Sequence, residues 1–131
     1  VLATGDGAFA YNMTELSEMV AAGIDLTIIV GNDGAWGTEY HGHLKSMGRS
    51  INTLFGPQDF AAAARAFGAK GLRVKDAADL DAAIAQSLRE PGVHVVDALI
   101  DRDAGHILKT DPDLVVSLFD EMTVNTRAHL A

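Results

Sequence analysis

Short apolar runs recur along the chain and are separated by longer, more polar stretches. Residues 26–30 are apolar or β-branched throughout, which predicts a strand that is buried on both faces of a sheet. Shorter or more mixed runs of the same kind predict three further strands, at residues 1–4, 72–74 and 93–100. Glycines follow the first two runs directly and mark where those strands end.

The stretches between the strands carry helical periodicity and helix end signals. Asn12 is positioned to cap a helix, with Glu15 three residues later as in a capping box, and Gly23 ends that helix. Pro57 suits the first turn of a second helix, which Gly68 stops. The pattern therefore predicts helices over residues 12–22, 57–67, 76–88 and 112–122.

Strands that alternate with helices of this length predict an α/β fold, a parallel sheet with helices on both faces. The 131 residues suit a single domain. The first strand begins at Val1 without an initiator Met, so we expect the domain to be incomplete at its amino end and the chain to be a fragment of a longer one. Ligands of such sheets bind outside the carboxyl ends of the strands.

Composition excludes several classes of partner. The net charge of −8 argues against a nucleic acid, which selects for a basic surface. No apolar run approaches the roughly 20 residues that a membrane-spanning helix needs, so we expect no membrane. The absence of cysteine rules out a thiol nucleophile and fits a reducing compartment, from which we expect a cytoplasmic protein. Arg73 is expected on a solvated face.

Two turns with oxygen-bearing side chains follow the first two strands. Gly5-Asp6-Gly7 follows residues 1–4, and Asn32-Asp33 follows residues 26–30, with Asp33 27 residues beyond Asp6. That separation suits one crossover between parallel strands. The Gly7 and Ala8 N–H groups, together with a helix start, would attract an anion. Because Asp6 would repel a phosphate, its presence there indicates a cation between them, and Mg²⁺ is the natural one. A plain tight turn is the alternative interpretation.

These residues resemble a known family. Gly5-Asp6-Gly7, a helix, a strand and then Asn32-Asp33 look like the thiamine diphosphate motif, which is GDG followed after a couple of dozen residues by NN. Downstream, Asp59-Phe60 and the run Ala66-Phe67-Gly68-Ala69-Lys70-Gly71 are similar to the acetolactate synthase and benzoylformate (2-keto acid) decarboxylase group. The resemblance covers about residues 1–101, and it implies a C-terminal cofactor-binding (pyrophosphate) domain.

The resemblance implies roles for particular residues. Asp6, Asp33 and the Ala35 carbonyl would bind Mg²⁺, although the family usually has Asn where this chain has Asp33. A shift of one residue would instead make Asn32 the ligand and Gly34 the carbonyl donor. Trp36 would pack on the cofactor or seal the end of the sheet. The other residues expected to contact thiamine diphosphate are Gly5, Gly7, Ala8, Phe9, Asn32, Gly37 and Thr38.

Glu39 is the candidate catalytic residue, because some relatives carry Glu at this place. A carboxyl group there would relay protons if burial raised its pKa towards neutrality. An exposed Glu at the start of a helix is the alternative interpretation.

The function implied is part of a 2-keto acid decarboxylase or carboligase. The group that activates the cofactor would come from a pyrimidine-binding domain of the same or another subunit, in a homodimer or homotetramer. A non-catalytic or regulatory α/β phosphate-binding module is the alternative function.

Overall fold

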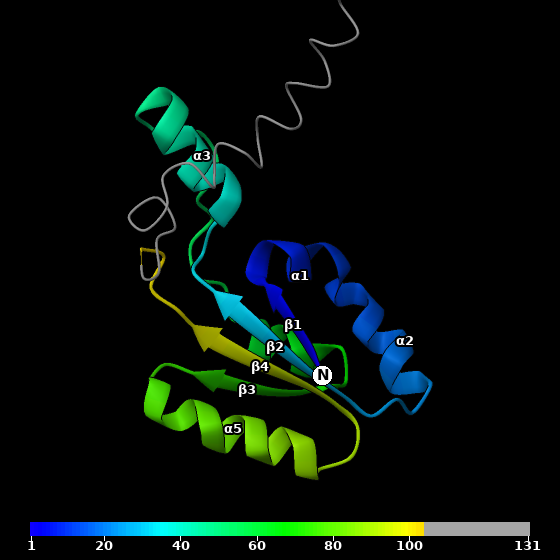
Figure 1. The fold of residues 1–131 in the computed structure, drawn as a ribbon. Coiled ribbons are helices and arrows are strands. Elements are labelled where there is room, and N and C mark those ends of the chain that lie inside the picture. Colours follow the sequence, from blue (N-terminus) through cyan, green and yellow to red (C-terminus); the bar gives the residue numbers. More distant parts are fainter. Residues whose placement is uncertain (104–131) are drawn as a thin grey trace, which may run out of the picture.

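The computed structural model describes residues 1–103 of the chain. In this part of the chain, four parallel strands form one sheet in the order β1-β2-β4-β3 (Figure 1). The strands are β1 (Leu2–Gly5), β2 (Leu26–Asn32), β3 (Lys70–Val74) and β4 (Val93–Leu99). The helices are α1 (Asp6–Asn12), the 3₁₀ turn η1 (Met13–Glu15), α2 (Leu16–Ala21), α3 (Gly37–Met47), α4 (Phe60–Ala66) and α5 (Ala77–Arg89). The helix expected at residues 112–122 lies outside the described residues.

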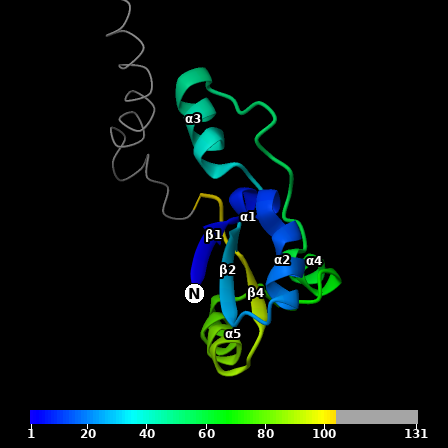
Figure 2. The same cartoon turned by 90° about the vertical axis from the view of Figure 1, so that its right-hand side faces the viewer.

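Helices cover both faces of the sheet, so the expected fold class is confirmed. Helices α1, α2 and α4 lie on one face and α5 lies on the other (Figure 2). The core under α1, α2 and α4 centres on buried Phe9, Leu16 and Phe60, which pack against Ile28, Val30, Val93 and Val95 of the sheet. The core under α5 is smaller and consists of Val74, Val96 and Ala98 with partly buried Leu80 and Ala83.

The first helix begins earlier than the sequence pattern predicts. Helix α1 starts at Asp6, directly after the extended Gly5, and the chain then passes through η1 into α2. The prediction that Asn12 caps this helix is wrong, because no side-chain capping bond forms there and the Asn12 amide donates to the Ala8 carbonyl. The early start follows from Phe9, which must be inside the core to meet Phe60, edge to face at 5.3 Å between ring centroids.

Two other helices also differ from expectation. Helix α4 begins at Phe60 rather than at Pro57, because Asp59 caps it by accepting the Ala62 N–H at 2.8 Å. Helix α3 extends beyond the carboxyl ends of the strands and buries none of its residues (Figure 1). It lacks the apolar stripe that periodicity detects, and for that reason the sequence pattern did not predict it.

The packing of α4 on β3 depends on Gly71. A Cβ atom at this position would lie 2.0 Å from the Ala61 carbonyl oxygen, a main-chain atom of α4. We expect Gly71→Ala to lower the free energy of unfolding of the full-length protein by about 1–3 kcal/mol, because the helix must move away from the sheet. Denaturant titration measures the effect. Gly5→Ala is the control, since no atom lies within 4 Å of its added Cβ, and equal losses in both variants would contradict the prediction.

Candidate functional site

The parallel register of β1 and β2 brings the two polar turns together. Gly5 at the end of β1 lies opposite Gly31 in β2, so Asp6 and the Asn32-Asp33 turn meet at the same edge of the sheet. The Gly34 N–H donates to Asp6 Oδ2 at 2.7 Å, which joins the two turns directly. The sequence prediction that these turns are neighbours is therefore correct.

Asp6 is a buried carboxylate with a second carboxylate near it. Its residue is only 3% exposed, and its oxygens accept the N–H groups of Gly7 and Gly34. Burial raises the pKa of Asp6 above its ordinary value, the two N–H bonds oppose that rise, and the negative charge of Asp33 adds to it. The site therefore favours a positive charge between the two carboxylates.

Gly34 is the residue that allows the second turn to close. Its φ of +71° is left-handed, and an added Cβ would lie 2.6 Å from the Gly56 carbonyl carbon. Gly56 belongs to residues 53–60, which we call the strap. The strap holds the turn through the main chain, because Phe55 and Gly56 donate to the Gly34 carbonyl and Trp36 donates to the Thr53 carbonyl.

Asp33 and Ala35 lie in the turn itself. Asp33 Oδ1 accepts the Ala35 N–H at 3.0 Å, and the Arg102 guanidinium donates to the Asp33 carbonyl. Ala35 pairs with Leu54 of the strap in an isolated antiparallel bridge. Asp33 is partly exposed and can reach a ligand outside the sheet edge.

Asn32 is a buried residue at the end of β2, directly before the second turn. Its side chain is 1% exposed, and its amide donates to Asp97 Oδ1 and to the Gln58 carbonyl, both at 2.8 Å. An amide nitrogen held in this way supports the turn from inside the protein. The Asn32 Oδ1 oxygen has no hydrogen-bond partner among the described residues, so a contact of Asn32 with the cofactor or the cation stays a prediction.

Three further expectations change in the structure. Phe9 is buried in the core against Phe60, so its ring cannot contact a cofactor. The Gly7 N–H, expected to point at an anion, donates to Asp6 Oδ1 at 2.8 Å. Trp36 packs over Gly7, where an added Cβ would lie 2.7 Å from the indole, and its ring also lies against Tyr11. Of the two interpretations of Trp36, sealing the sheet end matches these contacts.

Four other predicted residues lie in the first turns of α1 and α3. Ala8 is exposed on α1, and Gly37 and Thr38 form the start of α3. A Cβ on Gly37 would lie 3.5 Å from Asp33 Oδ2, so little space separates this helix from the carboxylate. Glu39 is exposed in the first turn of α3, the arrangement of the alternative interpretation, and its catalytic role stays a prediction.

Sequence reasoning missed Asp97. This residue of β4 is 0% exposed and accepts hydrogen bonds from Asn32, from the Phe60 N–H and from Arg73. Arg73 was expected on a solvated face, whereas it is 2.9 Å from Asp97 Oδ2. The sequence does carry a signal for Asp97, which is an acidic residue inside an otherwise largely apolar strand. Because a carboxylate is almost never fully buried unless it is paired, such a residue indicates a buried partner.

The donor set fits a divalent cation that also carries a phosphate ester. Within residues 1–103, no group of three or more His, Cys, Asp or Glu side chains could hold a metal alone. Asp6, Asp33 and the Ala35 carbonyl offer three oxygens, whereas octahedral Mg²⁺ needs about six. A diphosphate supplies the kind of oxygen that is missing. The arrangement thus suits Mg²⁺ bound together with a diphosphate.

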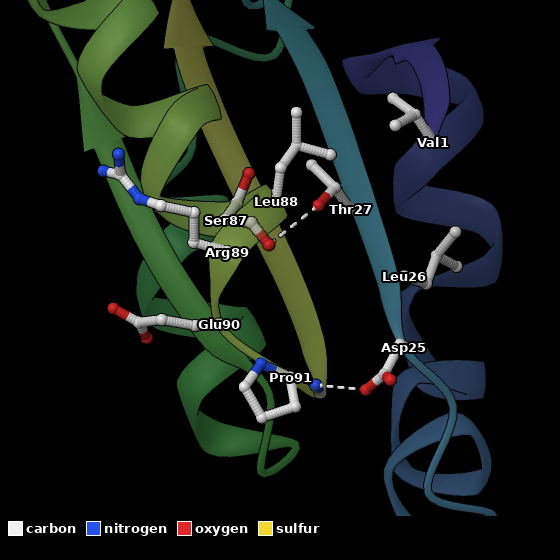
Figure 3. A pocket seen from close by; sticks show the side chains of 10 residues that line it. Val1, Asp25, Leu26, Thr27, Ser87, Leu88, Arg89, Glu90 and Pro91 are labelled. Atoms are coloured by element: carbon white, nitrogen blue, oxygen red, sulfur yellow. Dashed lines mark hydrogen bonds between the residues drawn. The ribbon is translucent and has the colours of Figure 1, made fainter.

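A cavity of about 280 Å³ lies elsewhere, at the amino ends of β2 and β4 beside the end of α5 (Figure 3). Its polar atoms bond to one another, since Gly92 donates to Asp25 and the Thr27 hydroxyl donates to the Ser87 carbonyl. None of the predicted site residues lines it. Among residues 1–103, no helix is long and apolar enough to cross a membrane.

Comparison with known proteins agrees with this geometry. The chain is 40% identical over 97 residues to a Mycobacterium tuberculosis protein whose name places it among acetolactate synthase large subunits, IlvB2, and this covers 74% of the chain and 18% of that protein. It is 31% identical over 101 residues to acetolactate synthase of Bacillus subtilis, covering 77% of the chain and 18% of the relative. The chain thus spans about a fifth of the length of these relatives.

A solved structure shares the fold. Benzoylformate decarboxylase from Polynucleobacter necessarius superposes with a TM-score of 0.71 at 23% identity, over 76% of this chain and 19% of that one. Residues 1–98 match the family described as thiamine pyrophosphate enzyme, C-terminal TPP binding domain. The two joined turns at the sheet edge therefore belong to a cofactor domain, and this chain is a member of the thiamine pyrophosphate enzyme family.

Proposed function

We propose that this chain binds Mg²⁺ and the diphosphate of thiamine diphosphate as one part of a 2-keto acid decarboxylase or carboligase. The observation that carries the proposal is the buried Asp6 carboxylate, joined to the second turn through Gly34 and near the charge of Asp33. Burial and the charge of Asp33 both disfavour an ionised Asp6, and a bound cation would offset both effects.

Each residue of the site has a distinct part in this proposal. Asp6 and Asp33 bind the cation, and the Ala35 carbonyl completes the protein's share of its shell. The start of α3, at Gly37 and Thr38, lies beside Asp33 and orients the diphosphate with its N–H groups. Asn32 and Phe9 support the turns from the core.

Thiamine diphosphate, when bound, would supply a nucleophilic ring carbon for a 2-keto acid and a ring that can take up the electrons left when CO₂ departs. The chain's own residues hold and orient that cofactor. The named relatives are acetolactate synthases and the structural neighbour is a benzoylformate decarboxylase, which supports a 2-keto acid as substrate. Activation of the cofactor would require a pyrimidine-binding domain, in a homodimer or homotetramer.

The first prediction concerns the cation. Thiamine diphosphate should bind the full-length protein more tightly with Mg²⁺ than without it, and Asp6→Ala should weaken that binding by more than about 10-fold, because the cation loses a ligand. Isothermal calorimetry measures both affinities. Asp81→Ala, which removes an exposed acid on α5, is the control of equal charge change. Binding that ignores Mg²⁺ would instead favour a plain phosphate-binding module.

The second prediction concerns the protonation of Asp6. Because its pKa is raised by burial, the stability it contributes is complete below the ordinary value of 3.8 and is lost as pH rises through the raised pKa. Carbon-13 NMR of the metal-free protein should show Asp6 titrating above 3.8, and Mg²⁺ should lower that pKa. Asp59 is the internal control, since the Ala62 N–H and Arg73 hold its pKa below 3.8. An Asp6 pKa that Mg²⁺ leaves unchanged would contradict metal binding there.

The third prediction concerns whether this chain alone can catalyse the reaction. The isolated 131-residue chain should not turn over pyruvate or benzoylformate, because no residue of the site can activate the pyrimidine ring. A coupled assay for CO₂ release measures this, with the full-length protein as positive control. Turnover by the isolated chain would contradict the need for a second domain.

A further inference from the structure

A polar network lies directly beneath the second turn. Asp97 is at the middle of the sheet, where its register partners are Val30 of β2 and Arg73 of β3. It is 0% exposed, so no solvent shares its charge. Oδ1 accepts the Asn32 amide at 2.8 Å, and Oδ2 accepts the Phe60 N–H at 3.0 Å and the Arg73 guanidinium at 2.9 Å.

The first connection from this network to the turn is direct. Asn32 is the last residue of β2 and immediately precedes Asp33, the proposed metal ligand. Its side chain donates to Asp97 and to the Gln58 carbonyl, so the residue is held at two points. These two bonds hold the end of β2 in place and so set the position from which the main chain enters the turn.

The second connection runs through the strap, residues 53–60. Its carboxyl end is anchored to the network, since the Gln58 carbonyl accepts Asn32 and Arg73, and the Phe60 N–H donates to Asp97. The other half of the strap bonds to Gly34 and Trp36 through the main chain. The turn between Asn32 and Trp36 is thus held at both of its ends by groups that converge on one carboxylate.

We propose that Asp97 is a positioning residue for the metal-binding turn, acting through Asn32 and the strap to hold Asp33 and the Ala35 carbonyl at the distance from Asp6 that the cation requires. This inference rests on the proposed function, because it assigns Asp97 to the same Mg²⁺ site. Asp97 does not touch the cation itself. Groups that orient metal ligands in this way change metal affinity by about 10–100-fold when they are removed.

The test compares two Asp→Asn variants, one inside the network and one outside it. Asp97→Asn places an NH₂ group against the donor of Asn32 or against those of Phe60 and Arg73, so the network must open. Asp81→Asn makes the same change at an exposed acid of α5, outside the strap and the network. In the full-length protein at saturating thiamine diphosphate, Asp97→Asn should raise the calorimetric Mg²⁺ dissociation constant about 10–100-fold, and Asp81→Asn should leave it unchanged.

A merely structural role gives a different result. If Asp97 only stabilises the fold, Asp97→Asn lowers the melting temperature and leaves the Mg²⁺ dissociation constant of the folded protein equal to that of Asp81→Asn, which overturns the proposal. If the wild-type protein binds thiamine diphosphate without any dependence on Mg²⁺, the proposed function and this inference both fall. A wild type that depends on Mg²⁺ beside an unaffected Asp97→Asn overturns the inference alone.

A second variant covers the case in which Asp97→Asn does not fold. Asn32→Ala removes the direct bond to the turn and leaves Asp97 with Phe60 and Arg73. It should also weaken Mg²⁺ binding by at least several-fold. Where Asp97→Asn does fold, the effect of the double variant should be smaller than the product of the single effects, as for residues in one network. Unchanged Mg²⁺ affinity in Asn32→Ala, or independent effects in the double variant, would contradict positioning through Asn32.

Discussion

The buried carboxylate of Asp97 determines how the parts of this domain fit together. A charge removed from water is tolerated only if every lone pair that faces the interior finds a donor, and breaking such a set costs about 3–5 kcal/mol. Here the donors come from the end of β2, the side chain of β3 and the first N–H of α4. These three elements therefore have one mutual arrangement that satisfies the charge, and the sheet edge takes its shape from that arrangement.

The electrostatic surroundings of Asp6 and Asp33, at the edge of the sheet, are opposite to those of Asp97. Asp97 meets a guanidinium, whereas Asp6 meets backbone N–H groups and the like charge of Asp33. Within residues 1–103, the buried carboxylate of Asp97 is thus neutralised by an arginine of the same chain, whereas Asp6 and Asp33 repel each other. In the proposed function, this difference separates a structural acid from two metal-binding acids.

Much of the fold follows from short-range patterns. Residues 26–30 predict a buried strand because every position is apolar or β-branched. Gly5 is indeed the last residue of β1, whereas β2 continues through Gly31 to Asn32. The start of α1 could not be predicted in the same way, since Asn12 and Glu15 carry a local capping signal that the core contact of Phe9 overrides. Helix α3 has no apolar stripe to detect.

The same difference between local and long-range signals applies to the residues of the candidate site. Asp6 and Asp33 could be identified because they directly follow strands, and the parallel register then brings them together. The role of Asn32 could not be identified from the sequence, because its partner Asp97 is 65 residues away and no local pattern connects them.

The close approach of Gly71 to the Ala61 carbonyl affects how the core can vary. The spacing of α4 from the sheet is set by main chain against main chain, so core side chains can change in volume during evolution while the anchor of the strap keeps its position.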